Sequence, residues 1–276
     1  MPSATPLQAS AAPSFHEARS EFLQQGHWKP RTANEVQRLL KHFDWQKTLD
    51  KITPSDIFAV IDSIPAKSEA SNALKYIKVF FNWCIPRYLV HTPCTGIKPP
   101  ARYVPRERLL SMQELAAIWR AADTMGQYGR QVQLLILTGQ RCNQFRQDHF
   151  VDITNMVITF PPAAMKNNRS HTIPIGTLTA SLLGGTPVRF DSSKKRELDQ
   201  LSGVTDWTLH DIRRAFASGM ASLGIQLPVI ERLLAHRSGS FAGIVSVYQL
   251  HDYLPEARRA IDLWQNHILK LTGTCA

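Results

Sequence analysis

Apolar residues recur at intervals of three and four through the first third of the chain. Phe15, Ala18 and Phe22 lie on one face of such a segment, and Gly26 ends it. Three further segments show the same period. Together these four predict a small all-helical domain, with helices at 15–25, after Pro30, at 53–63 and at 67–84, the last ending before Pro86.

In the second half of the chain, some apolar residues recur with the spacing of a helix and others with the spacing of a strand. Ser111 and Glu114 form a capping signal, and a following apolar helix, 132–137, stops at "TGQR". The runs "NMVITF" and "SHTIPI" predict two short strands joined by a loop, and further helices are expected at 209–223, 228–235, 243–250 and 255–270. The predicted fold class is therefore mainly α with a small β-sheet.

One proline-rich and basic stretch divides the two halves. It predicts a linker at 98–108, between a helical domain at 14–97 and a larger, mostly helical domain at 109–276. Residues 1–13 are rich in Pro, Ala and Ser and carry no charge, so we expect a disordered lead-in there.

The charge balance suggests a polyanionic partner. Lys and Arg outnumber Asp and Glu by 32 to 22, and the pI is near 9.7. The four cysteines form no C-x-x-C pair and no zinc-type cluster, so no metal site is predicted. With no secretory signal and no apolar run of membrane-spanning length, a cytoplasmic protein without a membrane partner is expected.

The stretch "TLHDIRRAF" carries the first candidate chemistry. Thr208 and Asp211 form a capping signal, which places His210 and Arg213 three residues apart at the positive end of a helix. Both side chains can donate to one phosphate. Taken alone, the motif is weak and favours an ordinary solvated helix face. Arg214 is expected to be only a salt-bridging or backbone-contacting neighbour.

Four other residues are candidates of the same kind. Arg141 follows an apolar helix and a glycine, and Lys166 lies near the tip of the predicted hairpin. His236 follows another apolar helix, and Tyr248 lies in an apolar run. Each also has an ordinary structural interpretation. The arginine can cap a helix, the lysine can be solvated, the histidine can lie at a helix C-terminus, and the tyrosine can belong to the core.

The order of these residues along a basic chain resembles the tyrosine site-specific recombinases, in particular the phage-type integrases. The matching segments are "LLILTGQR", "MKNNRSHTIPI", "LHDIRRAFASGMASLGI", "VIERLLAHRSGS" and "GIVSVYQLHDYLPEARRAIDLW". The helical half, notably "NALKYIKVFFNWCI", is similar to the core-binding domain of these enzymes. The resemblance covers about residues 14–270.

The resemblance implies a site and a reaction. Tyr248 would attack a DNA phosphodiester to form a 3′-phosphotyrosine, and Arg141 and Arg213 would bind the non-bridging oxygens. Lys166 would protonate the leaving 5′-oxygen and His210 would exchange a proton near the nucleophile. His236 would hydrogen-bond a phosphate oxygen. No cofactor is needed for this chemistry.

The implied function is site-specific recombination, integrating or excising a phage or other mobile element. The partners would be double-stranded DNA at attachment sites, held between the two domains, further copies of the chain in a homotetramer, and accessory bending or directionality proteins. The alternatives are a type IB-like topoisomerase and a catalytically impaired DNA-binding relative. The setting would be a bacterial cell or a phage-infected host.

Three departures from the family pattern stand out. Gln144 occupies the position where an acid is expected after the first arginine, and it is the feature that favours the impaired relative. Tyr253 is a rival nucleophile, five residues after the preferred one. The first 14 residues are too few for the arm-binding domain of many phage integrases, so we expect a minimal recombinase or a trimmed one.

Overall fold

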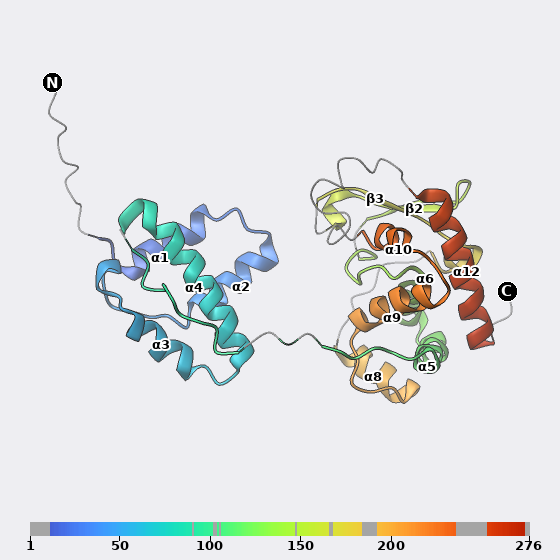
Figure 1. Cartoon of the computed structure of the whole chain (residues 1–276), viewed down its shortest axis with the longest axis horizontal. Helices are drawn as coiled ribbons and strands as arrows, with labels where there is room; N and C mark the ends of the chain where they lie inside the picture. The colour runs from blue at the N-terminus through green and yellow to red at the C-terminus, as the bar shows by residue number, and fades with distance from the viewer. Residues whose placement is uncertain are drawn as a thin grey trace, which may run out of the picture. The chain divides into compact units, whose positions relative to one another are not determined.

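The computed structural model describes residues 12–89, 91–101, 104, 106–146, 148–165, 168–183, 192–235 and 253–273. The chain divides into two compact units, Met1–Pro105 and Arg106–Ala276, each with its own hydrophobic core (Figure 1). In the described ranges no helix is both long enough and apolar enough to cross a bilayer.

The first unit is all helical. Capping boxes at Ser14 and Thr53 start two of its helices, because each cap exchanges hydrogen bonds with an acidic residue three positions on. Its core is rich in aromatic rings that meet edge to face, such as Phe15 and Phe22 against Phe80. The elements are α1 (Phe15–Gln25), α2 (Pro30–Leu40), η1 (Leu49–Lys51), α3 (Pro54–Ser63) and α4 (Lys67–Tyr88).

The expected end of α4 before Pro86 was wrong. The helix continues through the proline to Tyr88, although proline removes one backbone hydrogen bond. The last turn is held by its side chains. The Arg87 guanidinium lies over the Trp83 ring and donates to the Trp83 carbonyl, while the Tyr88 hydroxyl donates to Glu21 of α1.

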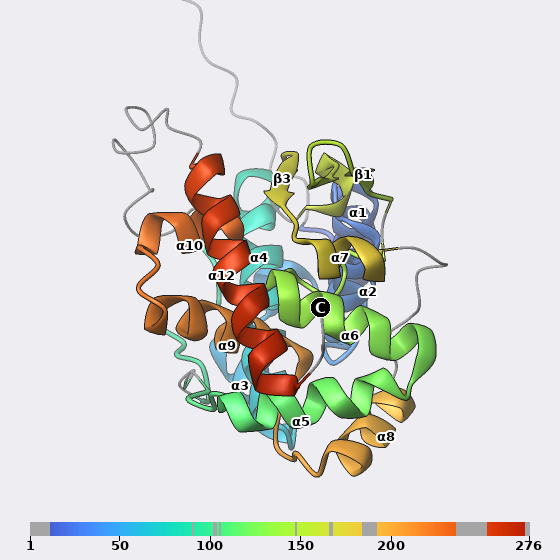
Figure 2. The ribbon, with the colours of Figure 1, turned by 90° about the vertical axis from the view of Figure 1, so that its right-hand side faces the viewer.

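The second unit packs helices around the long C-terminal helix. Figures 1 and 2 show α12 running beside α10, α9, α6 and α5, and the contacts agree. Trp264 of α12 is fully buried, meets the Phe216 ring edge to face and donates to the Ile136 carbonyl over 2.9 Å. The helices are α5 (Met112–Asp123), α6 (Gly126–Thr138), α7 (Thr177–Leu182), α8 (Ser192–Ser202), α9 (Leu209–Ser222), α10 (Leu227–Leu233) and α12 (Leu254–Thr272).

A small antiparallel sheet of order β1-β2-β3 completes the second unit. It consists of β1 (Phe150–Asp152), β2 (Val157–Phe160) and β3 (His171–Pro174), with η2 (Pro162–Ala164) between the last two. The register places Ile158 opposite Ile173 and Phe160 opposite His171, and all four side chains are buried. The inner face of the sheet therefore belongs to the hydrophobic core.

The predicted fold class, mainly helical with a small sheet, is confirmed. The two strands and most helices lie where the periodicity predicts them, whereas β1, α7 and α8 were not predicted. These three lack a clear signal: β1 is exposed along its length, α7 has six residues and α8 is strongly polar. The predicted helix 243–250 lies outside the described residues.

We expect Gly219→Ala to destabilise the second unit. A Cβ atom built at Gly219 in α9 would lie 2.4 Å from the Trp264 ring, closer than real contacts allow. Overpacking of this kind costs about 1–3 kcal/mol, more than the helix propensity of alanine returns. Urea denaturation measures the change. Ser218→Ala, at the exposed preceding position, should cause no loss, and equal losses in both variants would contradict the packing argument.

Candidate active site

The first predicted site residue, Arg141, follows the turn that ends α6. Gly139 caps this helix in the left-handed conformation, with φ at +64°, and its N–H donates to Leu135. A Cβ atom at this glycine would lie 2.4 Å from the Phe216 ring of α9. The turn therefore needs glycine both for its conformation and for the close approach of the two helices.

A pair of buried glutamines holds the turn that carries Arg141. The Arg141 N–H donates to Gln144 Oε1 over 2.8 Å. The Gln144 amide nitrogen in turn donates to Gln140 Oε1 at 2.9 Å and to Met165 Sδ at 3.3 Å. Both glutamines are 2% exposed. Gln144 thus acts on the main chain of Arg141 and uses its donor as well as its acceptor.

The capping signal at the start of α9 is present in the structure. Asp211, which is buried, accepts from the Thr208 N–H over 2.8 Å and from the Thr208 hydroxyl over 3.1 Å. This start fixes the rotation of the helix. It turns Arg213 inward, with 3% of its surface exposed, while His210 remains exposed one turn earlier.

The Arg213 guanidinium is held by main-chain carbonyl groups. One nitrogen donates to the Gly139 carbonyl over 2.9 Å and another to the Leu234 carbonyl, at the end of α10. Gly139 is the C-cap of α6, the helix before Arg141, and Leu234 lies two residues before His236 in the sequence. Arg213 therefore ties α9 to the ends of two other helices.

Arg141 and Arg213, named here the guanidinium pair, carry positive charge that no described carboxylate pairs with. Burial and the Arg141 charge lower the pKa of Arg213 to about 9, and burial lowers the pKa of Arg141. Each guanidinium is still protonated at neutral pH. Two partly desolvated cations that act on each other form a site that an anion would stabilise.

His210 lies in the field of the same pair. Partial burial and the positive charges of Arg213 and Arg141 lower its pKa, and the neighbouring Asp211 opposes the shift. The shift favours the neutral imidazole at neutral pH. In that form one ring nitrogen can accept a proton.

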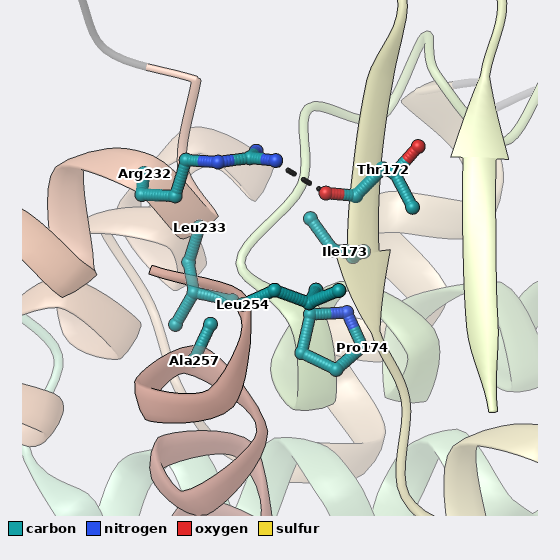
Figure 3. A pocket seen from close by; sticks show the side chains of 7 residues that line it. All are labelled: Thr172, Ile173, Pro174, Arg232, Leu233, Leu254 and Ala257. Atoms are coloured by element: carbon teal, nitrogen blue, oxygen red, sulfur yellow. Dashed lines mark hydrogen bonds between the residues drawn. The ribbon is translucent and has the colours of Figure 1, made fainter. Parts of the chain in front are cut away.

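The carbonyls of Leu233, the last residue of α10, and of Leu234, its C-cap, are named here the α10 carbonyl end. The Leu233 oxygen accepts from Gln140 Nε2 at 2.8 Å and from His171 Nε2 at 3.0 Å. Arg232 supports the arrangement by donating to the Thr172 carbonyl over 3.2 Å (Figure 3). The site turn, the sheet and α9 therefore meet at the end of one short helix.

A second group of arginines fixes the start of the second unit. The Arg108 guanidinium forms a two-pronged salt bridge with Glu114 and lowers the pKa of that carboxyl to about 2. Arg106 binds Asp206 at 2.7 Å and approaches the buried Asp211 at 3.8 Å. This end of the predicted linker, 106–108, therefore contacts the helix that carries His210.

The expected role of Arg214 is confirmed. Its guanidinium lies 3.7 Å from Asp211 and donates to the Arg106 carbonyl.

Three predicted site residues, Lys166, His236 and Tyr248, lie outside the described residues. The rival nucleophile Tyr253 is described: it precedes α12 and packs against the core of the second unit. The described ranges contain no cluster of side chains suited to a metal ion. Of the predicted site, the structure thus brings together Arg141, Arg213 and His210.

Sequence reasoning missed the polar residues that support the site. Gln140, His171 and Arg232 contact the α10 carbonyl end or its neighbours, yet no motif marks them. One signal was available for His171. It alternates with Ile173 and Ile175, which places all three on one face of the predicted strand, and that face is buried.

We expect Gln144→Glu to destabilise the second unit. A carboxylate can accept from the Arg141 N–H, but it would face the acceptors Gln140 Oε1 and Met165 Sδ without a proton to donate. An unmatched buried polar group costs about 1–3 kcal/mol. Urea denaturation at neutral pH measures the loss. The same change at the exposed Gln127, in the first turn of α6, should cause none, and a stable Gln144→Glu protein would contradict this account.

Comparisons with known proteins were made on sequence and on structure. No protein-family model matches the sequence, and no curated protein matches it significantly. Solved structures do match. A lambda integrase dimer bound to a COC′ core site is 18% identical, with a TM-score of 0.67 over 81% of this chain and 95% of that one.

Two further structures extend the likeness. A lambda integrase tetramer bound to a Holliday junction is 16% identical and has a TM-score of 0.69 over 86% of this chain and 77% of that one. The Tn1549 transposon integrase in complex with transposon right end DNA is 12% identical and has a TM-score of 0.60 over 90% and 98%. The chain therefore shares the fold of these integrases, which is that of the tyrosine recombinases.

Proposed function

We propose that the chain is a tyrosine recombinase, an integrase that cleaves and rejoins DNA through a 3′-phosphotyrosine intermediate. The observation that carries the proposal is the guanidinium pair. The buried Arg213 and the partly buried Arg141 have the exposed His210 beside them and no described counter-ion, so they form an anion site suited to a phosphodiester. The order of candidate residues along the chain and the fold support the same reaction.

In this reaction the Tyr248 oxygen forms a bond to phosphorus while the bond from phosphorus to the 5′-oxygen breaks. His210 accepts the phenol proton, and Lys166 gives a proton to the departing 5′-oxygen. The guanidinium pair binds the two non-bridging oxygens, where negative charge develops. Rejoining is the reverse attack by a 5′-hydroxyl of the partner strand. The phosphodiester energy is conserved in the covalent link, so the reaction needs no cofactor.

The way Arg213 is anchored suits this role. Its two hydrogen bonds go to carbonyl groups, which orient the guanidinium without neutralising it. A carboxylate partner would compete with the phosphate for the same donors. The positive charge therefore remains available to DNA.

We propose that Gln144 is compatible with catalysis. Its amide both accepts from the Arg141 N–H and donates to Gln140 Oε1, whereas a carboxylate could only accept. The proposed partners are double-stranded DNA at attachment sites, further copies of the chain in a tetramer, and accessory bending or directionality proteins. The DNA-bound dimer and tetramer of lambda integrase suggest that assembly. We propose integration or excision of a phage or other mobile element, inside a bacterial cell.

The first test is capture of the covalent intermediate. We expect the wild-type chain, incubated with nicked fragments of its source genome, to form protein–DNA adducts that precipitate with SDS and potassium. Sequencing the trapped DNA should return a few related sites. The Tyr248→Phe variant should form no adduct, whereas Tyr253→Phe should still form one, because Tyr253 packs against the core.

The outcomes of this test separate the alternatives. An absence of wild-type adducts would rule out the recombinase. Adducts spread over all sequences would favour a type IB-like topoisomerase. Loss of adducts in Tyr253→Phe alone would reassign the nucleophile.

The second test concerns the guanidinium pair. Arg213→Gln should slow adduct formation by about 10²–10³-fold, because it removes one of the two positive charges of the proposed phosphate site. The rate is measured in single-turnover reactions with a sequence recovered in the first test. Arg214→Gln is the matched control, since it removes the same charge one residue away. Equal losses in both variants would indicate a general charge effect rather than a phosphate clamp.

The third test is the pH dependence. Since burial and the arginine charges lower the pKa of His210, the folded protein keeps this imidazole neutral at neutral pH and to a lower pH than a free imidazole. Protonation at lower pH removes the acceptor, so the adduct rate should fall on the acid side. Single-turnover rates between about pH 8 and about pH 5 measure this limb. The His210→Asn variant should be slower and should lack this acid-side fall in the adduct rate. If the fall persists in the variant, another group titrates.

A further inference from the structure

Three segments around the site converge on the α10 carbonyl end. Gln140, next to Arg141, and His171, on β3, both donate to the Leu233 carbonyl, while Arg213 donates to the Leu234 carbonyl. The carbonyls at the end of a helix lack partners within the helix. These donors satisfy two of them and hold the end of α10 in one position.

The contacts of His171 fix its protonation. Its Nε2 faces the Leu233 carbonyl at 3.0 Å, and a carbonyl can only accept, so Nε2 carries a hydrogen. Its Nδ1 faces an Arg232 nitrogen at 3.2 Å, and a guanidinium can only donate, so Nδ1 carries none. Only the neutral imidazole with its proton on Nε2 satisfies both contacts.

We propose that His171, as this neutral tautomer, is a positioning residue for strand cleavage that holds the α10 carbonyl end against Arg213. The inference rests on the proposed recombinase function. His171 does not touch the phosphate itself. It acts through the Leu233 carbonyl, one residue before the carbonyl that orients the Arg213 guanidinium.

Burial and the charges around His171 keep the imidazole neutral. The charges come from three elements: Arg232 on α10, Arg213 on α9 and Arg141 after α6. Burial, with a smaller contribution from these cations, lowers the pKa of His171 to about 4, while the hydrogen bond to Leu233 opposes the shift. A second proton, on Nδ1, would point at the Arg232 guanidinium.

The surroundings leave no substitute for these contacts. His171 is 4% exposed and Leu233 is 1% exposed, so bulk solvent reaches neither partner of this hydrogen bond. Solvent therefore cannot replace a donor lost from the Leu233 carbonyl. The His171 ring also stacks on Phe160, with centroids 6.5 Å apart, and this contact needs no polar atom.

The experiment compares His171→Phe with His171→Gln. Phenylalanine keeps the ring and its stacking but loses both hydrogen bonds, whereas the glutamine amide nitrogen can occupy the place of Nε2 and donate to Leu233. Single-turnover adduct rates are measured on the recovered DNA at saturating protein and normalised to the final adduct yield. We expect a loss of about tenfold to a hundredfold for His171→Phe and recovery of most of the rate in His171→Gln.

The matched control is Thr172→Val. The Thr172 hydroxyl pairs with that of Thr159 across the sheet, and Arg232 uses only the Thr172 main-chain oxygen. This variant removes a side-chain hydrogen bond from the same strand without touching the α10 carbonyl end. Its rate should equal that of the wild type. A fast His171→Phe, or equal losses in His171→Phe and His171→Gln, would overturn the proposal.

A second measurement separates this proposal from the recombinase function. The ¹⁵N resonances of the wild-type His171 ring should show a proton on Nε2 alone from neutral pH down to about pH 5. A ring protonated on Nδ1, or on both nitrogens at neutral pH, would overturn the positioning role whether or not adducts form. A wild-type chain with the expected ring signals but no adduct would instead rule out the recombinase.

Discussion

A buried guanidinium needs partners that solvate its charge, and the choice of partner decides what the charge can do. In this chain the carbonyl groups of Gly139 and Leu234 take that role for Arg213. Carbonyl dipoles stabilise a cation without cancelling it. The left-handed turn after α6 and the end of α10 must both be in place to present these oxygens. The geometry of the candidate site therefore depends on where two helices stop.

This arrangement relies on main-chain atoms, which every sequence supplies. At 12–18% identity to the lambda and Tn1549 integrases, few side-chain contacts need be shared, yet the fold is the same. Gln144 shows that a side chain of this fold can differ in charge from the expected residue. It is neutral where an acid is expected, yet it holds the Arg141 turn because its neighbours supply one donor and one acceptor.

Local signals in the sequence were sufficient for much of the fold. The capping residues predicted the starts of α3, α5 and α9, and alternation predicted β2 and β3. The order of Arg141, His210 and Arg213 along the chain predicted the three described residues of the candidate site. The partners of Arg213 could not be predicted, since they lie 74 and 21 residues away and are backbone atoms without a residue signature. The continuation of α4 past Pro86 likewise depends on a contact with Glu21 in another helix.

The contacts of Arg106 and Arg108 determine where the two units can be separated in a fragment or a chimaera. Both arginines belong to the second unit through Asp206, Asp211 and Glu114, although they precede its first helix. A fragment of the second unit that begins at Leu109 would leave the buried Asp211 without Arg106. A chimaera that takes its N-terminal unit from another protein should therefore be joined before Arg106. Both arginines then stay with the second unit, whose residues they contact.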